Sequence, residues 1–143
     1  MTLLHSTGLR NFKLGTGLAT AFDTNGAIAF FTGTMPARDA ANTETLLATL
    51  PLSADSFGTP SAAAAVANTI TSDVNVDASG TPGYFCIWNT TQTALTSAAS
   101  ATDRRLYGTV TINGGGGDIT FDNITWVAGG TAAMSGFTYT ESP

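Results

Sequence analysis

Short apolar runs recur along the chain at spacings of about ten residues, and each run ends at Gly, Pro, Asn, Asp or Ser. Strands punctuated by such turn residues are typical of all-β sandwiches and barrels. The pattern predicts strands near residues 27–32, 45–52, 66–71, 83–88, 105–112, 118–127 and 131–140. We therefore expect an all-β fold.

Alternation with a period of two places apolar side chains on one face of a strand. Two of the runs show this alternation clearly, and their apolar residues are candidates for the core. They are Leu46, Ala48, Leu50 and Leu52 in the second run, and Ala133, Phe137 and Tyr139 in the last.

The opening segment, residues 1–26, lacks strict alternation. Its apolar residues are Leu9, Phe12, Leu14, Leu18 and Phe22. This spacing fits either a short helix weakened by glycines or an extended N-terminal arm, and it does not decide between them. The sequence thus predicts an arm or short helix over 1–26 and one β-sandwich domain over 27–143.

Three stretches are predicted to connect strands. Residues 34–44 contain Pro36, which cannot donate to a strand ladder, and residues 89–103 are rich in Thr, Ser and Ala. Gly114–Gly117 lie between two strand-like runs and precede Asp118, with no lysine nearby. Because a phosphate-binding loop needs cationic partners and a following helix, we interpret the glycines as the tip of a mobile hairpin.

Charged residues make up only 10% of the chain, the formal net charge is −5, and Lys13 is the only lysine. Nucleic-acid binding needs a stripe of cations, so DNA and RNA are not expected partners. No stretch approaches the length of a membrane span, and the first residues lack the apolar segment of a signal peptide. We therefore expect no membrane partner and a chain made and folded in a cytosol.

The residues that usually carry catalysis are scarce. His5 is the only histidine and lies in the N-terminal stretch, which we expect to be flexible, and Cys86 is the only cysteine, inside an apolar strand. A relay through histidine, a zinc site and an intrachain disulfide are therefore not expected, and Cys86 is interpreted as a core thiol. Asp118 and Asp122 fit a wet strand surface better than a catalytic pair.

Residues Asp73–Gly80, "DVNVDASG", place oxygen ligands at alternate positions, as a calcium loop does. The sixth position is Ala78 instead of glycine, and the twelfth is Tyr84 instead of glutamate. A weak calcium site between Asp73 and Asp77 stays open as an alternative to a solvated turn. The sequence predicts no required metal or cofactor.

Five aromatic side chains offer a different kind of site. Exposed together, they would form a platform on which sugars stack, whereas aromatics in the strands of a small sandwich usually pack in the core. We favour the core for all five: Tyr84, Trp88, Tyr107, Trp126 and Tyr139.

Several motifs follow one another between about Ala27 and Thr140. They are "IAFFTGTMPA", "TLLATLPLSADSFG", "VANTITSD", "ASGTPGYFCIW" and "ITWVAGGTAAMSGFTYT". In order and spacing the chain resembles a family of small tailed-bacteriophage virion proteins. The resemblance is carried by Thr32–Pro36, Leu46–Leu50, Ala62–Ala67 and Gly80–Phe85. The chain departs from the family at the N-terminus, where relatives have a clearer helix and this chain has two glycines, Gly15 and Gly17.

The resemblance implies a β-sandwich or jelly-roll structural component without catalytic residues. We expect a capsid decoration or cement protein on the exterior of the head, bound to the major capsid protein of the same phage and assembled as a small homo-oligomer, with a trimer favoured. An acidic protein is repelled by packaged DNA, which fits the exterior of the virion. The alternatives are a tail, neck or baseplate component and a carbohydrate-binding module.

The N-terminal segment is the predicted contact with the capsid. It is too short and too rich in glycine to build a core of its own, so a neighbouring subunit is a reasonable place for it to order. A frayed terminus and an edge strand of the sandwich are the alternatives. The predicted contact residues are Leu9, Arg10, Phe12, Lys13 and Leu14.

Overall fold

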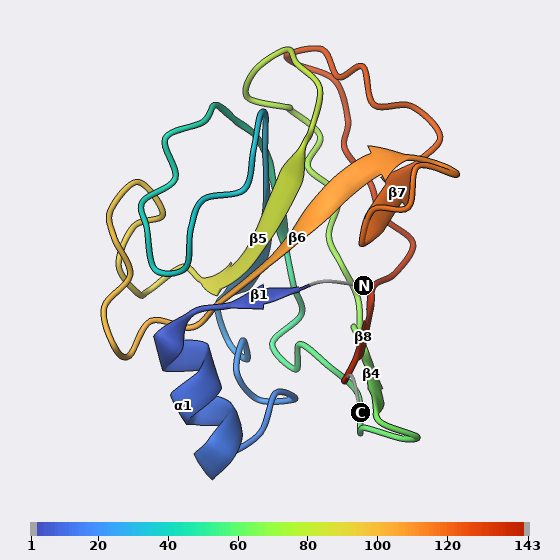
Figure 1. Cartoon of the computed structure of the whole chain (residues 1–143). Helices are drawn as coiled ribbons and strands as arrows, with labels where there is room; N and C mark the ends of the chain where they lie inside the picture. Colours follow the sequence, from blue (N-terminus) through green and yellow to red (C-terminus); the bar gives the residue numbers. More distant parts are fainter. Residues whose placement is uncertain (1–2, 142–143) are drawn as a thin grey trace.

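The computed structural model describes residues 3–141, apart from the side chains of residues 14 and 15. The described chain is all-β with one short helix, as the sequence predicts. The elements are β1 (Leu4–His5), α1 (Thr7–Gly15), β2 (Gly26–Phe31), β3 (Leu46–Pro51), β4 (Ala64–Val66), β5 (Tyr84–Asn89), β6 (Arg105–Ile112), β7 (Ile119–Phe121) and β8 (Thr138–Thr140). Figure 1 shows their arrangement.

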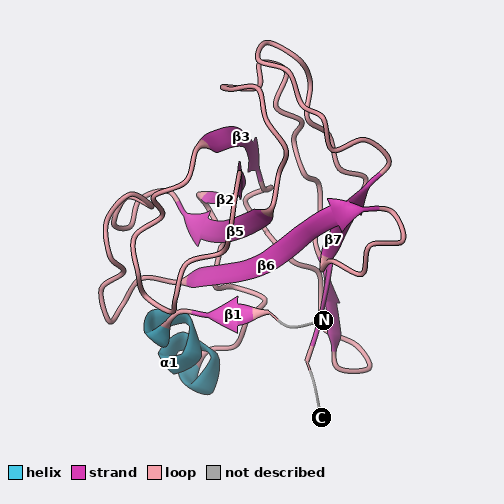
Figure 2. Cartoon of the chain, turned by 45° about the horizontal axis from the view of Figure 1, so that its top comes forward, coloured by secondary structure: helices cyan, strands magenta, loops and turns pink. Residues whose placement is uncertain are grey.

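The main sheet has the strand order β1-β6-β5-β2-β3, and β7 also pairs with β6. The order is visible in Figure 2, where β3, β2, β5, β6 and β1 follow one another across the sheet. β1 pairs with β6 at Leu106 and Tyr107, whereas β7 pairs with it from Val110 to Ile112. The two short strands therefore share β6 at different points along its length.

A second, two-stranded sheet of β4 and β8 packs against one face of the main sheet. Phe137, next to β8, contacts Phe85 of β5 with ring centroids 5.7 Å apart, and it contacts Phe57 at 6.3 Å. Ala65 of β4 and Tyr139 of β8 are buried in the same apolar cluster. The fold is therefore sandwich-like, with its main core between the two sheets.

The other face of the main sheet is buried as well. Its strands contribute Ala29, Phe31, Tyr84, Cys86 and Tyr107 to a second apolar cluster. The cluster is completed from the two long connections, by Leu95 and by the half-buried Met35. The loops predicted at 34–44 and 89–103 are thus confirmed as loops, and they also cover a face of the sheet, which the sequence pattern does not predict.

A buried arginine holds the second of these loops in place. Arg105 has no exposed surface, and its guanidinium donates hydrogen bonds to the carbonyl oxygens of Thr93, Ala94 and Ser97 at 3.0–3.1 Å. Loop carbonyls away from regular structure need such donors when they face the interior. One side chain therefore fixes the path of residues 93–97 over the sheet.

The N-terminal segment belongs to the main core. Ser6 caps helix α1, because its hydroxyl oxygen accepts a hydrogen bond of 3.1 Å from the Leu9 amide. Leu9, Leu18 and Phe22 are buried in the cluster that also contains β2, β3, β5 and β6. Of the two predicted conformations, the helix is the one observed, and His5 lies in a paired strand instead of the flexible stretch expected for it.

The glycine-rich loop does not close a hairpin, so that prediction is wrong. β7 runs parallel to β6, with Val110 opposite Ile119. The chain folds back along β6 through Gly114 and Gly116, whose φ angles are 87° and 78°. A six-residue connection between parallel neighbours is unusually tight, and residues without a Cβ tolerate these left-handed conformations.

Three predicted strands are shorter or shifted. Only Ile119–Phe121 of 118–127 and Thr138–Thr140 of 131–140 form strands, and 66–71 is replaced by Ala64–Val66. The strand predicted at 118–127 ends early because the Asn123 side chain accepts a hydrogen bond from the Thr125 amide and so forms a local turn.

Most of the predicted core residues are buried. They are Ala48, Leu50, Leu52, Phe137 and Tyr139. Leu46 and Ala133 are exposed instead, and these two predictions are wrong. Leu46 is the first residue of β3, opposite a register shift between Phe30 and Phe31, and Ala133 lies outside β8.

Candidate functional site

The predicted contact residues on helix α1 have different environments. Leu9 is fully buried, so it offers no surface to another protein. Arg10 is exposed, whereas Phe12 is half-buried under the Arg104 guanidinium, 4.5 Å from its ring centroid. The side chain of Leu14 lies outside the described residues. Among the side chains of the helix that the structure describes, the exposed ones are therefore polar.

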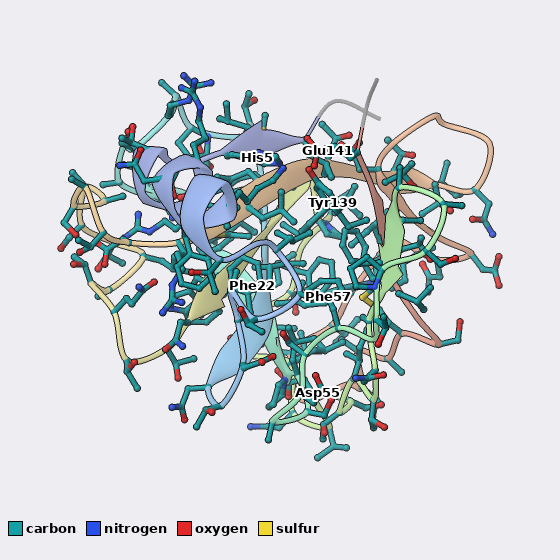
Figure 3. All side chains as sticks on the ribbon, turned by 90° about the horizontal axis from the view of Figure 1, so that it is seen from below. His5, Phe22, Asp55, Phe57, Tyr139 and Glu141 are labelled. Atoms are coloured by element: carbon teal, nitrogen blue, oxygen red, sulfur yellow. The ribbon has the colours of Figure 1, made fainter. Side chains whose placement is uncertain are left out.

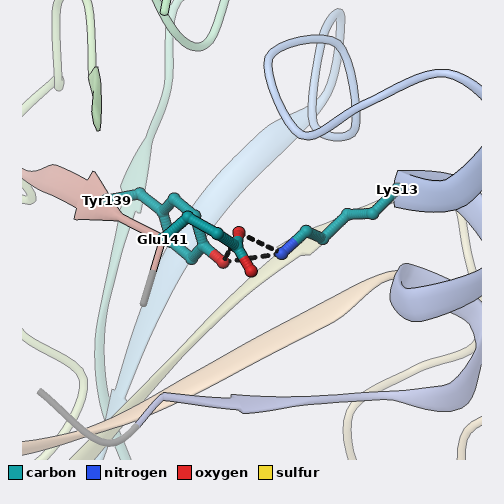
Figure 4. Close-up of polar contacts among 3 residues, drawn as sticks. All are labelled: Lys13, Tyr139 and Glu141. Carbon is teal, nitrogen blue, oxygen red and sulfur yellow. Dashed lines mark hydrogen bonds and ion pairs between the residues drawn. The ribbon is translucent and has the colours of Figure 1, made fainter. Parts of the chain in front are cut away.

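Lys13 joins the helix to the last strand. Its ammonium group lies 2.6 Å from the Tyr139 hydroxyl oxygen and forms an ion pair with Glu141, which also accepts a hydrogen bond from Tyr139 (Figure 4). Hydrogen bonds from Lys13 and Tyr139 lower the pKa of Glu141. Burial, with the Glu141 charge, raises the pKa of Tyr139. We name these three residues the terminal cluster.

His5 lies beside the terminal cluster, as Figure 3 shows for Tyr139 and Glu141. Its ring centroid is 5.8 Å from that of Tyr139. Burial, assisted by the charge of Lys13, lowers the pKa of His5 from 6.5 to about 4. Its Nε2 atom is buried and has no hydrogen-bond partner among the described residues. His5 is therefore a neutral packing residue at pH 7.

The other groups considered for chemistry serve the fold. Cys86 is fully buried as predicted, and burial raises the pKa of its thiol to about 12. The Asp118 carboxylate accepts two hydrogen bonds from Thr109 at 2.8 Å. Because a thiol with such a pKa stays protonated, it does not act as a nucleophile at neutral pH.

The "DVNVDASG" segment folds as a turn. One Asp73 oxygen accepts a hydrogen bond from the Thr49 amide at 3.0 Å, and the other accepts one from the Asn75 amide at 2.9 Å. Within residues 3–141, no three His, Cys, Asp or Glu side chains are grouped closely enough to hold a metal ion. The Asp73 carboxylate is thus occupied by backbone donors.

The aromatic side chains divide into two groups. Tyr84, Tyr107 and Tyr139 are buried, which confirms the prediction for them. Trp88 and Trp126 are only half-buried. Trp88 packs on the second apolar cluster, whereas Trp126 lies at a surface groove. The expected core position thus holds only in part for the two tryptophans, which pack against the core clusters and keep some exposed surface.

Two adjoining cavities of about 470 and 410 Å³ share Phe121 and Ala133. One wall runs through residues 118–127, and the other through residues 130–138. We name these two neighbouring cavities together the Phe121 groove. Sequence reasoning missed it because both walls were predicted as long strands, which would have packed flush in a sandwich.

A further surface lies where three segments are joined by backbone hydrogen bonds. The Asp77 amide donates to the Leu47 carbonyl at 2.7 Å, and the Val76 amide donates to the Gly130 carbonyl at 3.0 Å. Loops 72–80 and 126–132 lie together at the top of Figure 1. With the start of β3, they form what we name the apical surface.

The apical surface carries exposed aliphatic side chains. Val74 is 73% exposed, Val127 is 63% exposed and Leu46 is 36% exposed. Large apolar side chains gathered on adjoining segments are typical of protein interaction sites. The chain therefore has two candidate sites, the apical surface and the Phe121 groove, which meet at Val127.

Comparisons with protein-family models, with curated proteins and with solved structures find no match for this chain. The described residues contain no helix of the length and apolar character that crossing a bilayer requires. Function is therefore argued from the chain's own residues.

Proposed function

We propose that this protein is a non-enzymatic structural component of a bacteriophage virion, and that it decorates or cements the exterior of the head. The observation that carries the proposal is the apical surface, where Leu46, Val74 and Val127 are exposed on segments bonded to one another. Burying these side chains against a neighbouring protein would be favourable, by about 25 cal/mol for each Å² of apolar surface removed from water.

The composition of the surface supports a binding role. Charged residues make up 10% of the chain, so an interface on it requires little desolvation of charge. The short side chains of Thr, Ala and Ser also lose little rotamer entropy when they are buried. The net charge of −5 favours a position away from packaged DNA.

The partners follow from this position. The major capsid protein of the same phage would bind the apical surface, and the decoration protein itself would form a small homo-oligomer, with a trimer favoured. The resemblance of the motif order to that of small tailed-phage virion proteins, inferred from the sequence, is the basis of this assignment. A tail, neck or baseplate component is the main alternative, because the same kind of fold serves in either location.

Helix α1 can contribute through its exposed residues only. Among the predicted contact residues whose side chains the structure describes, Arg10 is the exposed one, and Lys13 is paired with Glu141. Deletion of the N-terminal segment is not a test of capsid binding, because it would also remove Leu9, Leu18 and Phe22 from the core. Single substitutions at exposed positions are the appropriate test.

Co-sedimentation with undecorated heads tests the proposal. We expect the purified protein to sediment with heads of its own phage, and the double variant Val74→Asp, Val127→Asp to lose at least tenfold in affinity. The control is Val66→Asp, because Val66 is 56% exposed but lies in β4, outside the apical surface. If apolar burial dominates, raising the salt concentration should change binding little.

Two results would overturn the assignment. Folded protein that never sediments with heads, but binds purified tails, would move it to the tail. Head binding that Val66→Asp weakens as strongly as the apical double variant would remove the apical surface from the interface. Replacing Arg10 by Glu in the same assay measures how much helix α1 contributes to head binding. We expect this contribution to be smaller than that of the apical surface.

A further inference from the structure

The Phe121 groove is unlike the apical surface in its chemistry. Its two cavities together fall within the range of about 300–1,000 Å³ that ligand pockets in proteins occupy. Because the two cavities share Phe121 and Ala133, a ligand of more than one unit can occupy both. The groove is separate from the terminal cluster, because no residue that lines the groove belongs to that cluster.

Phe121 lines both cavities, and Trp126, beside it, lines the smaller one. The rings of Phe121 and Trp126 contact edge to face, with centroids 5.2 Å apart and an interplanar angle of 82°. Phe30 supports the indole from the core side of the sheet at 5.3 Å. The indole Nε1 donates a hydrogen bond of 3.2 Å to the Asn123 carbonyl. The ring is therefore held in one orientation before any ligand binds.

The exposed part of a half-buried indole fixed in this way is an apolar surface that needs little ordering on binding. Such a surface suits the C–H face of a sugar ring. Trp88, the other tryptophan, lies outside the groove on the second apolar cluster. In the groove, Trp126 therefore lies in the smaller cavity, next to the polar groups of the larger one.

The polar groups of the groove match hydroxyl groups. Asp122 accepts a hydrogen bond from the Asn113 side chain, and both residues are exposed on the wall of the larger cavity. A carboxylate paired with an amide presents acceptors and a donor side by side, which suits neighbouring hydroxyls. Ser135 and Thr138 add hydroxyl groups to the same cavity.

The charge of the groove restricts its ligand. Asp118 and Asp122 line the larger cavity, and no Lys, Arg or His is among the described residues that line either cavity. A phosphate, sulfate or sugar carboxylate placed there would be repelled by the Asp122 carboxylate, since no cationic side chain is among the described residues that line the cavities. An uncharged ligand rich in hydroxyl groups meets no such cost.

We infer that the Phe121 groove binds a neutral oligosaccharide, with Trp126 and Phe121 as its stacking surface and the Asp122–Asn113 pair as its hydroxyl-binding group. An extended peptide is the competing occupant, and the carboxylate, amide and hydroxyl groups of the larger cavity favour the saccharide over it. The saccharide site goes beyond the proposed role in the virion and gives the protein a second binding activity.

The test begins with an array of neutral and acidic bacterial and host oligosaccharides, probed with labelled wild-type protein. We expect neutral glycans to be bound and acidic ones to be absent from the hits. The strongest hit is then titrated into the Trp88→Phe variant, in which Trp126 is the only tryptophan. We expect a saturable change in Trp126 fluorescence.

Substitutions then assign the site. Asp122→Ala should weaken binding at least tenfold without changing the melting temperature, because Asp122 is exposed. Trp126→Ala should abolish binding, and if it does not fold, Asn113→Ala serves as a second test of the same cavity. Trp88→Phe is the control and should bind the glycan normally, because Trp88 lines neither cavity.

Three results would overturn the inference. They are an array without a neutral hit, a hit whose binding leaves Trp126 fluorescence unchanged, and a hit that Asp122→Ala and Asn113→Ala leave unaffected. A displayed peptide library is screened in parallel, and a peptide that alters Trp126 fluorescence where no glycan does would replace the saccharide. Head binding by Asp122→Ala should stay normal, so the two proposals fail separately.

Discussion

The ammonium nitrogen of Lys13 lies 2.6 Å from the hydroxyl oxygen of Tyr139, although the two residues are 126 positions apart in the chain. This contact joins helix α1 to strand β8, and Glu141 completes it. The N-terminal segment is therefore attached to the fold by polar contacts at its surface and by Leu9 and Phe22 in the core.

The first prediction concerns that attachment. Leu9 and Phe22 are fully buried, so replacing either by Ala removes apolar contacts and leaves a cavity. We expect Leu9→Ala to lower the free energy of unfolding by about 2–5 kcal/mol and Phe22→Ala by about 3–5 kcal/mol. Urea denaturation followed by circular dichroism measures both changes.

Arg10→Ala is the matched control on the same helix. Its side chain is exposed, so the change in unfolding free energy should stay within about 0.5 kcal/mol. Equal stabilities for Leu9→Ala and Arg10→Ala would mean that the segment is not packed in solution. In that case the segment would again be an arm available to a neighbouring subunit.

The second prediction is an acid-sensitive stability that depends on His5. Burial, assisted by Lys13, lowers the pKa of His5 from 6.5 to about 4 in the folded protein. Between these pH values the unfolded chain carries a proton that the folded chain lacks, so stability falls as the pH drops from 6.5 to 4. Below pH 4, His5 adds no further loss.

Thermal melting across this range, with His5→Gln as the comparison, measures the effect. The variant should lose less stability between pH 6.5 and 4, because glutamine does not titrate. Glu141 contributes at lower pH, since its pKa is lowered from 4.5 and its pairing is lost only on protonation. As His5 is the only histidine, its imidazole NMR signals report the pKa directly. A midpoint near 6.5 would contradict the prediction.

Local patterns in the sequence predict the central strands well. β2, β3, β5 and β6 match the predicted strands to within a residue at each end, because turn residues bound their apolar runs on both sides. The chain from residue 113 onward is predicted poorly. There the path of the backbone is set by hydrogen bonds to side chains, such as those from Thr109 to the Asp118 carboxylate. Such bonds join residues that only the folded chain brings together, so a local sequence pattern does not predict them.

The candidate sites show the same limit. The sequence identifies Trp126 as a residue to consider, but its exposure depends on how residues 130–138 pass the edge of the sheet. Leu9 is predicted to contact the capsid because it is apolar. The sequence pattern does not show whether such a residue is buried against a partner protein or in the chain's own core. The apical surface likewise depends on the pairing of loops distant in sequence.

The third prediction concerns Cys86. Its side chain is fully buried, and burial raises the pKa of the thiol to about 12. Only the thiolate reacts with disulfide reagents, so native protein at pH 8 should not be labelled, whereas urea-unfolded protein should be labelled once per chain. Absorbance during reaction with an aromatic disulfide measures this. Rapid labelling of the native protein would mean that the loops over the second face open readily.

The fourth prediction concerns Arg105, which holds the loop over that face. Its guanidinium donates to the carbonyls of Thr93, Ala94 and Ser97. Arg105→Met would leave these oxygens without their donors, and each loss of a partner costs about 1–3 kcal/mol when water cannot replace it. Since the loop can shift toward water, we expect a total loss of about 2–4 kcal/mol of unfolding free energy.

The neighbouring Arg104→Met is the matched control for this change. Arg104 is half-buried and stacks on Phe12 at the surface, so its loss should cost about 1 kcal/mol or less. Hydrogen exchange should separate the two variants further, with faster exchange in residues 93–103 for Arg105→Met alone. Equal losses of stability in the two variants, or unchanged exchange in this loop, would contradict the prediction. The loop would then be held by Leu95 and Asn42 instead, because the Asn42 side chain donates a hydrogen bond of 2.9 Å to the Leu95 carbonyl.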